Sequence, residues 1–326
     1  MLSRVADSIY WMARYVERAE NLARFIDVTM NLLLDQPPDS PGQWAPLVST
    51  TGDNEYYAAN YGEANQSNVI RFLAFDRDYP NSIISSLAAA RENARTVRET
   101  ISSEAWEQLN EFFLFVRHAA DSAVPPAPVE FFAAVKQQSH LFNGVLDSTM
   151  SHDQGWLFAN LGRLLERADK TSRILDVKYF TLLPNLQSVG STLDDLQWSA
   201  VLRSVSGFEM YRKRHHGITV HRVVQFLILD RAFPRAVRFC IARADDSLHE
   251  IAGTASGTFS NSAEQRLGRL RSDLDFTDVD TIINEGLHEY IDRLQTQLNA
   301  VGNAVNETFF EFQQDGAMQS QQQVQV

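Results

Sequence analysis

The residues best placed to do chemistry lie in a charged segment, YVERAENLARFIDV at 15–28, that returns at 164–177 as LLERADKTSRILDV. Glu17 and Glu20 stand one helical turn apart, so they could act as an acid and a base or hold a metal ion. The neighbouring arginines would keep both carboxylates ionised, which favours salt bridges over proton transfer. The candidates for catalysis are therefore Glu17, Glu20 and the repeated Glu166. The sequence shows no complete catalytic constellation around them.

The two copies of this segment keep their charges better than their apolar residues. Between 10–28 and 159–177 seven positions are identical and five of these are charged, whereas Trp11 stands opposite Asn160. Charges on an exposed helix face can be exchanged at almost no cost, but removing one partner of a buried ion pair costs about 3–5 kcal/mol. We therefore predict a buried, ion-paired network. The alternative is an exposed helix with ordinary i,i+3 and i,i+4 pairs.

The arginines of this network are also candidates for ligand binding, because a guanidinium can grip a carboxylate or phosphate through two parallel hydrogen bonds. A second basic cluster, YRKRHHGITVHR at 211–222, stands out in an acidic chain, and the first half has YAANYGEANQSN in its place. This cluster could clamp an anion, with a histidine as proton carrier, or be a solvated loop. The candidate ligand-binding residues are Arg14, Arg18, Arg24, Arg163, Arg167, Arg212, Lys213, Arg214 and His215.

Signatures of metals and cofactors are weak. A di-iron bundle needs a Glu-x-x-His pair from each of two helices and two further glutamates. The chain offers Glu285 with His288 and a poorer pair of Asp246 with His249, both in the second half. It has no Gly-rich phosphate loop and no nucleophile elbow, and Cys240 lies in an apolar helical stretch typical of a core. We therefore predict no metal site and no cofactor.

The elements that position these residues come from a duplicated chain. A second block, VIRFLAFDRDYP at 69–80, recurs as VVQFLILDRAFP at 223–234 with six identical positions. A repeat near 150 residues indicates duplication of a domain rather than a short solenoid unit. The acid–base pairs in these blocks, Asp76–Arg77 and Asp230–Arg231, are predicted to join the charged network.

Hydrophobic residues recur with the helical period along nearly the whole chain, and strand-like alternation is nearly absent. We therefore expect an all-α fold, a tandem-duplicated helical bundle whose halves, 1–150 and 151–312, are related by a pseudo-twofold axis and pack as one unit. The glutamine-rich tail, 313–326, is expected to be disordered. The longer expected helices are 3–34, 82–101, 103–122, 129–149, 154–180, 235–252, 263–275 and 278–312.

Composition narrows the class of protein. The 326 residues are 44% hydrophobic and carry a net charge of −12, which argues against nucleic acid or an anionic membrane as the main partner. The single cysteine suits a reducing compartment, and the apolar runs are too short to span a bilayer. We expect a cytoplasmic protein.

Three segments resemble the alpha-E family, a bacterial all-helical family without an established reaction. They are MLSRVADSIYWMARYVERAENLAR at the start, ARENARTVRETISSEAWEQLN at 90–110 and FLILDRAFPRAV at 226–237, and the resemblance runs from Met1 to about Phe312. One departure is the turn RDYPNSI at 77–83, where proline precedes asparagine instead of following it. The matching polar residues are Arg14, Glu17, Arg18, Glu20, Arg24, Arg91, Glu92, Arg95, Arg98, Glu99, Trp106, Glu107 and Asp230.

The resemblance implies a context for the function. It implies gene neighbourhoods, and sometimes fusions, shared with a circularly permuted ATP-grasp protein and a transglutaminase-like peptidase, which make, modify or trim peptide-like amides. We therefore expect a helical accessory protein of an ATP-grasp-type ligase system, with the ligase and the peptidase as partners. The alternative is an enzyme that acts on a peptide or amide through a cavity lined by arginine and glutamate.

Overall fold

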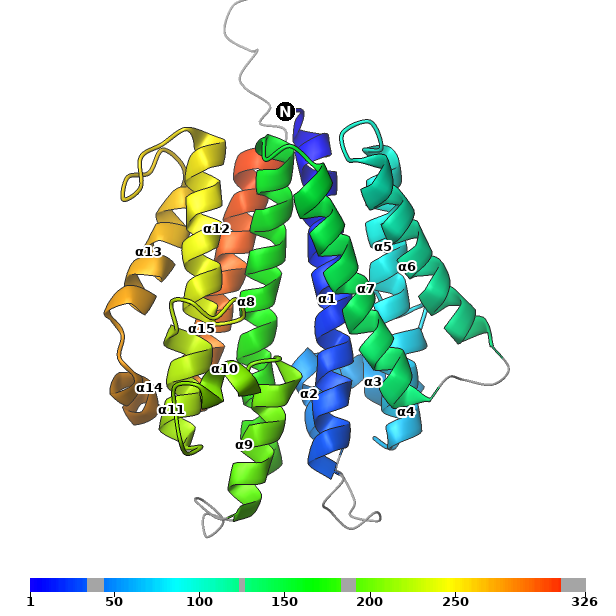
Figure 1. The fold of residues 1–326 in the computed structure, drawn as a ribbon, viewed down its shortest axis with the longest axis vertical. Helices are drawn as coiled ribbons and strands as arrows, with labels where there is room; N and C mark the ends of the chain where they lie inside the picture. The colour runs from blue at the N-terminus through cyan, green and yellow to red at the C-terminus, as the bar shows by residue number, and fades with distance from the viewer. Residues whose placement is uncertain (34–43, 123–126, 183–191, 312–326) are drawn as a thin grey trace, which may run out of the picture.

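The computed structural model describes residues 1–33, 44–122, 127–182 and 192–311, with the side chains of 177–182 and 192–193 left aside. Over this part of the chain the predicted all-α fold is confirmed, because helices and turns account for the structure and no strand occurs (Figure 1). None of the described helices is both long and apolar enough to cross a bilayer. The predicted tail, 313–326, lies outside the described residues.

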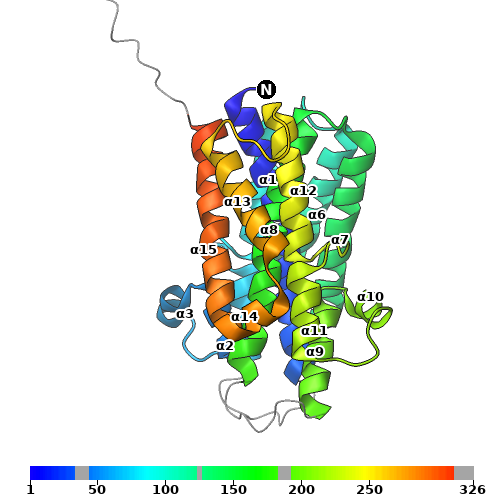
Figure 2. The same cartoon turned by 90° about the vertical axis from the view of Figure 1, so that its left-hand side faces the viewer.

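In the part of the chain that the structure describes, eight long helices stand side by side, and consecutive ones alternate in direction (Figure 1). Two of them, α1 and α8, lie next to each other at the centre and run in the same direction. Around α1 pack α5 and α7, with α6 outside them, and around α8 pack α12 and α15, with α13 outside them (Figure 2). The bounds are α1 Ser3–Leu33, α5 Ile83–Thr96, α6 Ser103–Asp121, α7 Pro128–Thr149, α8 Gln154–Leu182, α12 Val237–Ala252, α13 Ser262–Phe276 and α15 Leu287–Val305.

Shorter helices fill the end of the bundle opposite the N-terminus (Figure 1). Among the described residues, each half contains a widened five-residue turn directly after a short helix, Arg71–Phe75 in the first and Gln225–Leu229 in the second, and another such turn, Asn306–Phe310, follows α15. The short helices are α2 Ala45–Thr51, α3 Asn54–Asn60, α4 Gln66–Ile70, α9 Thr192–Ser204, α10 Phe208–Arg212, α11 Val220–Val224 and α14 Val279–Glu285.

The helix boundaries follow local chemistry. Side-chain oxygens of Ser82, Ser102 and Asn261 accept the backbone N–H three residues on and so begin α5, α6 and α13. The single helix expected over 278–312 was wrong, because Gly286 takes a φ of 103° and separates α14 from α15.

The central helices approach closely at one glycine. A Cβ added to Gly162 of α8 would lie 2.5 Å from the backbone carbonyl oxygen of Tyr10 in α1, so no larger residue fits there without movement of a helix. This approach brings the charged faces of α1 and α8 within hydrogen-bonding reach of each other.

The repeated Asp–Arg pairs do not join the central network, and that prediction was wrong. Asp76 caps the turn after 71–75 by accepting the N–H groups of Asp78 and Tyr79, and Asp230 does the same after 225–229. Arg77 instead pairs with Asp121 at 2.5 Å on the surface. The aspartates recur because both halves need the same turn.

Candidate functional site

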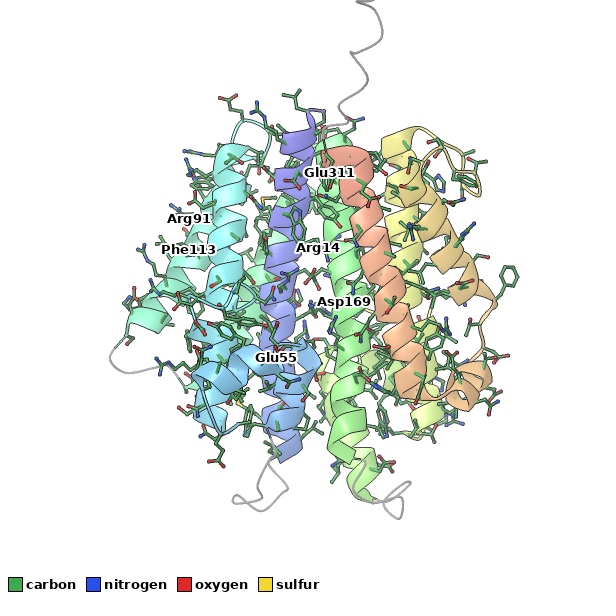
Figure 3. The ribbon with its side chains drawn as sticks, turned by 180° about the vertical axis from the view of Figure 1, so that it is seen from behind. Arg14, Glu55, Arg91, Phe113, Asp169 and Glu311 are labelled. Carbon is green, nitrogen blue, oxygen red and sulfur yellow. The ribbon has the colours of Figure 1, made fainter. Side chains whose placement is uncertain are left out.

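The repeated charges are buried, which confirms the network interpretation. Glu17, Glu20 and Glu166 have no exposed surface and Arg24 has 1%. They are buried because α1 is enclosed by α5, α7, α8 and α9, so its polar side packs against neighbours as fully as its apolar side does. Figure 3 shows α1 and α8 side by side, with Arg14 on the first and Asp169 on the second.

Two reciprocal pairs join α1 to α8. Arg167 of α8 donates through Nε and Nη2 to the two carboxylate oxygens of Glu17, at 2.9 and 2.8 Å. Arg18 of α1 donates through the same two nitrogens to Glu166, at 2.7 and 3.2 Å. Each pair has the two-pronged geometry that makes arginine–carboxylate bonds strong and directional. The glutamate and arginine of each sequence copy therefore bind the arginine and glutamate of the other.

A second layer repeats one turn further along both helices. Arg24 donates to Glu20 at 2.7 and 2.9 Å and to the backbone carbonyl oxygen of Ser204 at 2.5 Å. Arg173 donates to Asp169 at 3.0 Å and to the backbone carbonyl oxygen of Thr50 at 3.1 Å. Each arginine thus bonds an acid of its own helix and anchors a short helix of the other half of the chain.

One residue of the network was missed from the sequence. Arg235, two residues before α12, is buried and donates to Glu17, Glu20 and the amide oxygen of Asn21. Burial lowers its pKa to about 10, so it remains a cation at neutral pH. The matching position in the first half is Asn81, whose amide oxygen accepts a 2.7 Å hydrogen bond from Arg18. Because the two residues differ in type, the internal repeat gave no signal for Arg235.

The carboxylates of this network are held ionised. Burial alone would raise the pKa of Glu17, but Arg167 and Arg235 outweigh it and bring the pKa below its usual value. The pKa of Glu20 is lowered in spite of its burial, mainly by Arg235 and Arg24. Against the same cost of burial, Arg18 and its neighbours hold the pKa of Glu166 well below the usual value. None of the three can supply a proton near neutral pH.

A polar cavity of about 200 Å³ opens beside Glu166, between α1, α8 and the segment that carries Asn81. We call it the Glu166 cavity. Its lining carries four cationic side chains against two carboxylates, an excess of two positive charges. The rest of the lining is formed by Leu22 and Phe25 and by the hydrogen-bonding side chains of Thr50, Thr51, Tyr79, Asn81 and Asn299. The charged lining residues are Arg14, Arg18, Lys170, Arg173, Glu166 and Asp169.

The other candidate residues lie apart from this cavity. Arg163 borders a different cavity, between α8 and α12. The basic segment at 211–222 is a surface feature at α10 and α11, where Arg214 pairs with Asp230 and His221 pairs with Asp280 at 3.0 Å. Burial and neighbouring arginines lower the pKa of His215. Arg212, Lys213, Arg214 and His215 are therefore not brought together with the central arginines.

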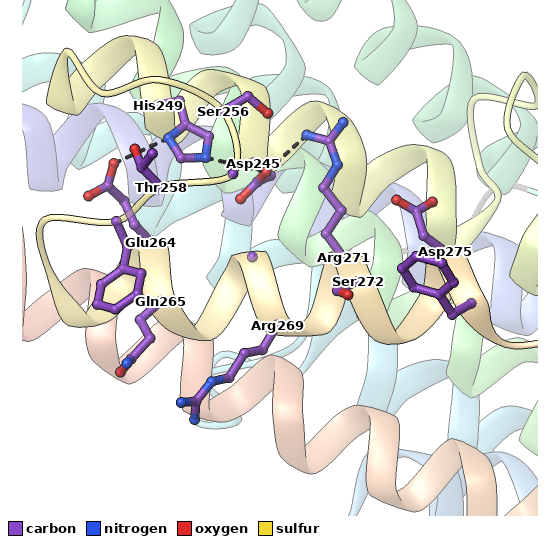
Figure 4. A pocket seen from close by; sticks show the side chains of 14 residues that line it. Asp245, His249, Ser256, Thr258, Glu264, Gln265, Arg269, Arg271, Ser272 and Asp275 are labelled. Carbon is purple, nitrogen blue, oxygen red and sulfur yellow. Dashed lines mark hydrogen bonds and ion pairs between the residues drawn. The ribbon is translucent and has the colours of Figure 1, made fainter.

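The residues considered as metal ligands in the sequence form contacts with other side chains. His288 contacts Asp176 at 3.0 Å and Glu285 pairs with Arg293 at 2.7 Å. His249 hydrogen-bonds Thr254 and contacts Glu264 and Asp245. It lies at the wall of a third cavity, of about 410 Å³, between α12 and α13, where Figure 4 draws its contacts with Glu264 and Asp245. Among the described residues no three His, Cys, Asp or Glu side chains group closely enough to hold a metal ion.

Comparison with known proteins finds relatives of this chain. An uncharacterized protein of Mycobacterium bovis and two of Mycobacterium tuberculosis are each 24% identical to the chain over 275 residues, which is 78% of this chain. The chain spans about 30% of the length of these relatives. No solved structure matches it.

The family model that matches residues 1–310 is described as a predicted alpha-helical domain with a conserved ER motif. The chain contains two Glu-Arg dipeptides, Glu17–Arg18 and Glu166–Arg167, and these form the reciprocal pairs between α1 and α8. The chain belongs to the Alpha-E family.

Proposed function

We propose that this protein is a cytoplasmic, non-catalytic accessory subunit that works with an ATP-grasp-type ligase and a transglutaminase-like peptidase. In this role it binds an anionic group, from its partner or from the partner's peptide-like substrate, in the Glu166 cavity. The observation that carries the proposal is the excess of two positive charges among the side chains that line the cavity. A preformed set of fixed guanidinium donors suits a carboxylate or phosphate.

The alternative, an enzyme acting on a peptide or amide, has less support. General acid–base catalysis needs a group whose pKa lies near the working pH. Glu17, Glu20 and Glu166 instead have lowered pKa values, and Glu17 and Glu20 border none of the described cavities. Burial raises the pKa of Cys240 to about 12, which makes its thiol a poor nucleophile.

We also propose that the bundle arose by tandem duplication, with 1–150 and 151–312 related by a pseudo-twofold axis between α1 and α8. In support, α1, α5, α6 and α7 pack in the same order as α8, α12, α13 and α15. The contacts of Arg24 with Ser204 and of Arg173 with Thr50 are reciprocal at the offsets of the sequence repeats. Superposition of the two halves in an experimental structure tests this, and unlike helix arrangements would contradict it.

The partnership is tested by mixing the purified protein with an ATP-grasp-type ligase of the kind that the family resemblance implies as its partner. We expect a complex in size-exclusion chromatography and a change in the ATP turnover of the ligase. The Arg18→Lys variant should keep the fold and lose this effect, because lysine cannot reproduce the two-pronged bond to Glu166. If no complex forms and ATP turnover is unchanged, the proposal fails. If the protein alone hydrolyses peptide amides, the enzymatic alternative takes its place.

A further inference from the structure

The charged side chains that line the Glu166 cavity form one chain of contacts. Arg14 pairs with Glu166 at 2.9 Å, and Arg173 pairs with Asp169 at 3.0 Å. Lys170 connects the two acids, since its ammonium group lies 2.8 Å from Asp169 and 3.7 Å from Glu166. Positive and negative groups therefore alternate within contact distance, with an arginine at each end of the chain. Because a further arginine, Arg18, also pairs with Glu166, the lining keeps its excess of two positive charges.

The arginines at the two ends have unused donors. Arg14 donates through Nε to Glu166 and through Nη1 to the hydroxyl of Tyr10. Arg173 donates through Nε to Asp169 and through Nη1 to a backbone carbonyl oxygen. Nη2 of each arginine bonds no atom of the described residues, although the two side chains are only 17% and 21% exposed. A cation that is mostly shielded from water and has free N–H groups is stabilised by an anion that accepts from them.

The volume and charge of the cavity distinguish between the anions that arginine binds. At about 200 Å³ it is smaller than the pockets of drug-sized ligands, roughly 300–1,000 Å³, so it suits a compact group. A carboxylate has one negative charge and two acceptor oxygens, and it would leave one positive charge of the lining unbalanced. A phosphate group has up to two negative charges near neutral pH and at least three acceptor oxygens.

We propose that the Glu166 cavity binds a phosphate dianion, either the free ion or the phosphate group of a monoester. Its two charges match the excess of the lining, and its oxygens can accept from the free Nη2 groups of Arg14 and Arg173. This inference rests on the proposed function, because it names the anion that the cavity takes.

A pH series separates the ionisation of the ligand from that of the cavity, whose lining contains no histidine. Burial would raise the pKa values of Glu166 and Asp169, but the neighbouring cations outweigh it and lower both. Burial would lower the pKa values of Arg14 and Arg173, but the neighbouring acidic groups outweigh it and raise both. These four groups therefore keep their charges between pH 5 and pH 7.5, whereas a phosphate monoester loses its second proton at about pH 6.

Calorimetric titration of the isolated full chain with methyl phosphate, inorganic phosphate, sulfate, acetate and malonate, at constant ionic strength, tests the inference. At pH 7.5 both phosphates should bind at least roughly tenfold more tightly than acetate, because they have the greater charge and more acceptors. From pH 5 to pH 7.5 the affinity for methyl phosphate should rise about tenfold, since its dianionic fraction rises from about a tenth to nearly all. Sulfate, whose charge does not change in this range, should bind equally at both pH values.

Variants locate the binding. Arg173→Gln removes one of the two excess charges and should weaken methyl phosphate binding at least roughly tenfold. If that variant does not fold, Lys170→Gln, which leaves Arg173 on Asp169, replaces it. The matched control is Lys136→Gln, which also loses one ion pair of a 21% exposed cation but lies outside the cavity, and it should bind as the wild type does.

The outcomes separate this inference from the proposed function. Acetate or malonate binding as tightly as methyl phosphate, or an affinity for methyl phosphate that is unchanged between the two pH values, would overturn the phosphate assignment and leave the anion-binding role. Unchanged binding in the Arg173 or Lys170 variant would place the phosphate outside the cavity and also overturn it. If none of the anions binds, the proposed role of the cavity fails as well. Binding of inorganic phosphate without methyl phosphate would identify the free ion as the ligand.

Discussion

Replacing Glu17 by alanine tests whether the repeated charges stabilise the fold as a buried network. Glu17 accepts both prongs of Arg167 and further hydrogen bonds from Arg235 and Asn21. In Glu17→Ala the guanidinium groups of Arg167 and Arg235, whose side chains are 11% and 7% exposed, would lose the carboxylate that both bind. Removing one partner of a buried pair costs about 3–5 kcal/mol. This is a large part of the 5–15 kcal/mol that typically separates folded from unfolded protein.

The matched control is Glu92→Ala on α5. Glu92 also pairs with two arginines, Arg91 and Arg95, but its side chain is 54% exposed. Such a pair contributes about 0–1 kcal/mol. Urea melts of the wild type and both variants give the free energies of unfolding. If Glu17→Ala does not fold, Glu17→Gln, which keeps the shape of the side chain, replaces it in this comparison. Losses below about 1 kcal/mol for both positions would refute the buried network.

Three further predictions follow from packing and ionisation. Gly162→Ala should destabilise the protein, because its Cβ would meet the backbone of Tyr10. Gly144→Ala on α7, where a Cβ would meet nothing within 4 Å, should stabilise it by about 0.5–1 kcal/mol. Thermal melts of the two variants check this. The carboxylates of the network have folded-state pKa values below the ordinary 4.5. Their contribution to the free energy of unfolding should therefore be complete above about pH 4.5 and be lost as the pH falls below it. A free energy of unfolding that is unchanged between pH 6 and pH 3 would contradict this. Cys240, buried with a raised pKa, should react with a thiol reagent only as fast as the protein opens, and rapid labelling of the folded protein would show the burial to be wrong.

The sequence could predict the network because its two copies constrain the same charges. Glu17 and Arg18 recur as Glu166 and Arg167 while their apolar neighbours change, since a buried pair cannot lose one member cheaply whereas apolar packing tolerates substitution. The helical period gave the long helices to within a few residues, apart from the break at Gly286, whose positive φ no periodicity reveals.

The internal repeat could not predict how the two sides of the central helix pair, α1 and α8, differ. Arg235 fills the space beside Glu17, whereas the shorter Asn81 stands beside Arg18 at the edge of the Glu166 cavity. A comparison that looks for identical residues passes over such a position. The Asp–Arg prediction failed for the opposite reason: Asp76 and Asp230 recur, but their shared role is to cap a turn.

The central claim is that the Glu166 cavity binds anions while the equivalent ion pairs elsewhere in the network only stabilise the fold. The most direct measurement is the rise in melting temperature caused by acetate or inorganic phosphate at constant ionic strength. It is made for the wild type, for Arg18→Lys and for Arg24→Lys. Arg18 lines the cavity, whereas Arg24 is buried against Glu20 outside it. The account predicts that the rise is lost with Arg18→Lys and kept with Arg24→Lys; the absence of any rise, or the same rise in all three proteins, would contradict it.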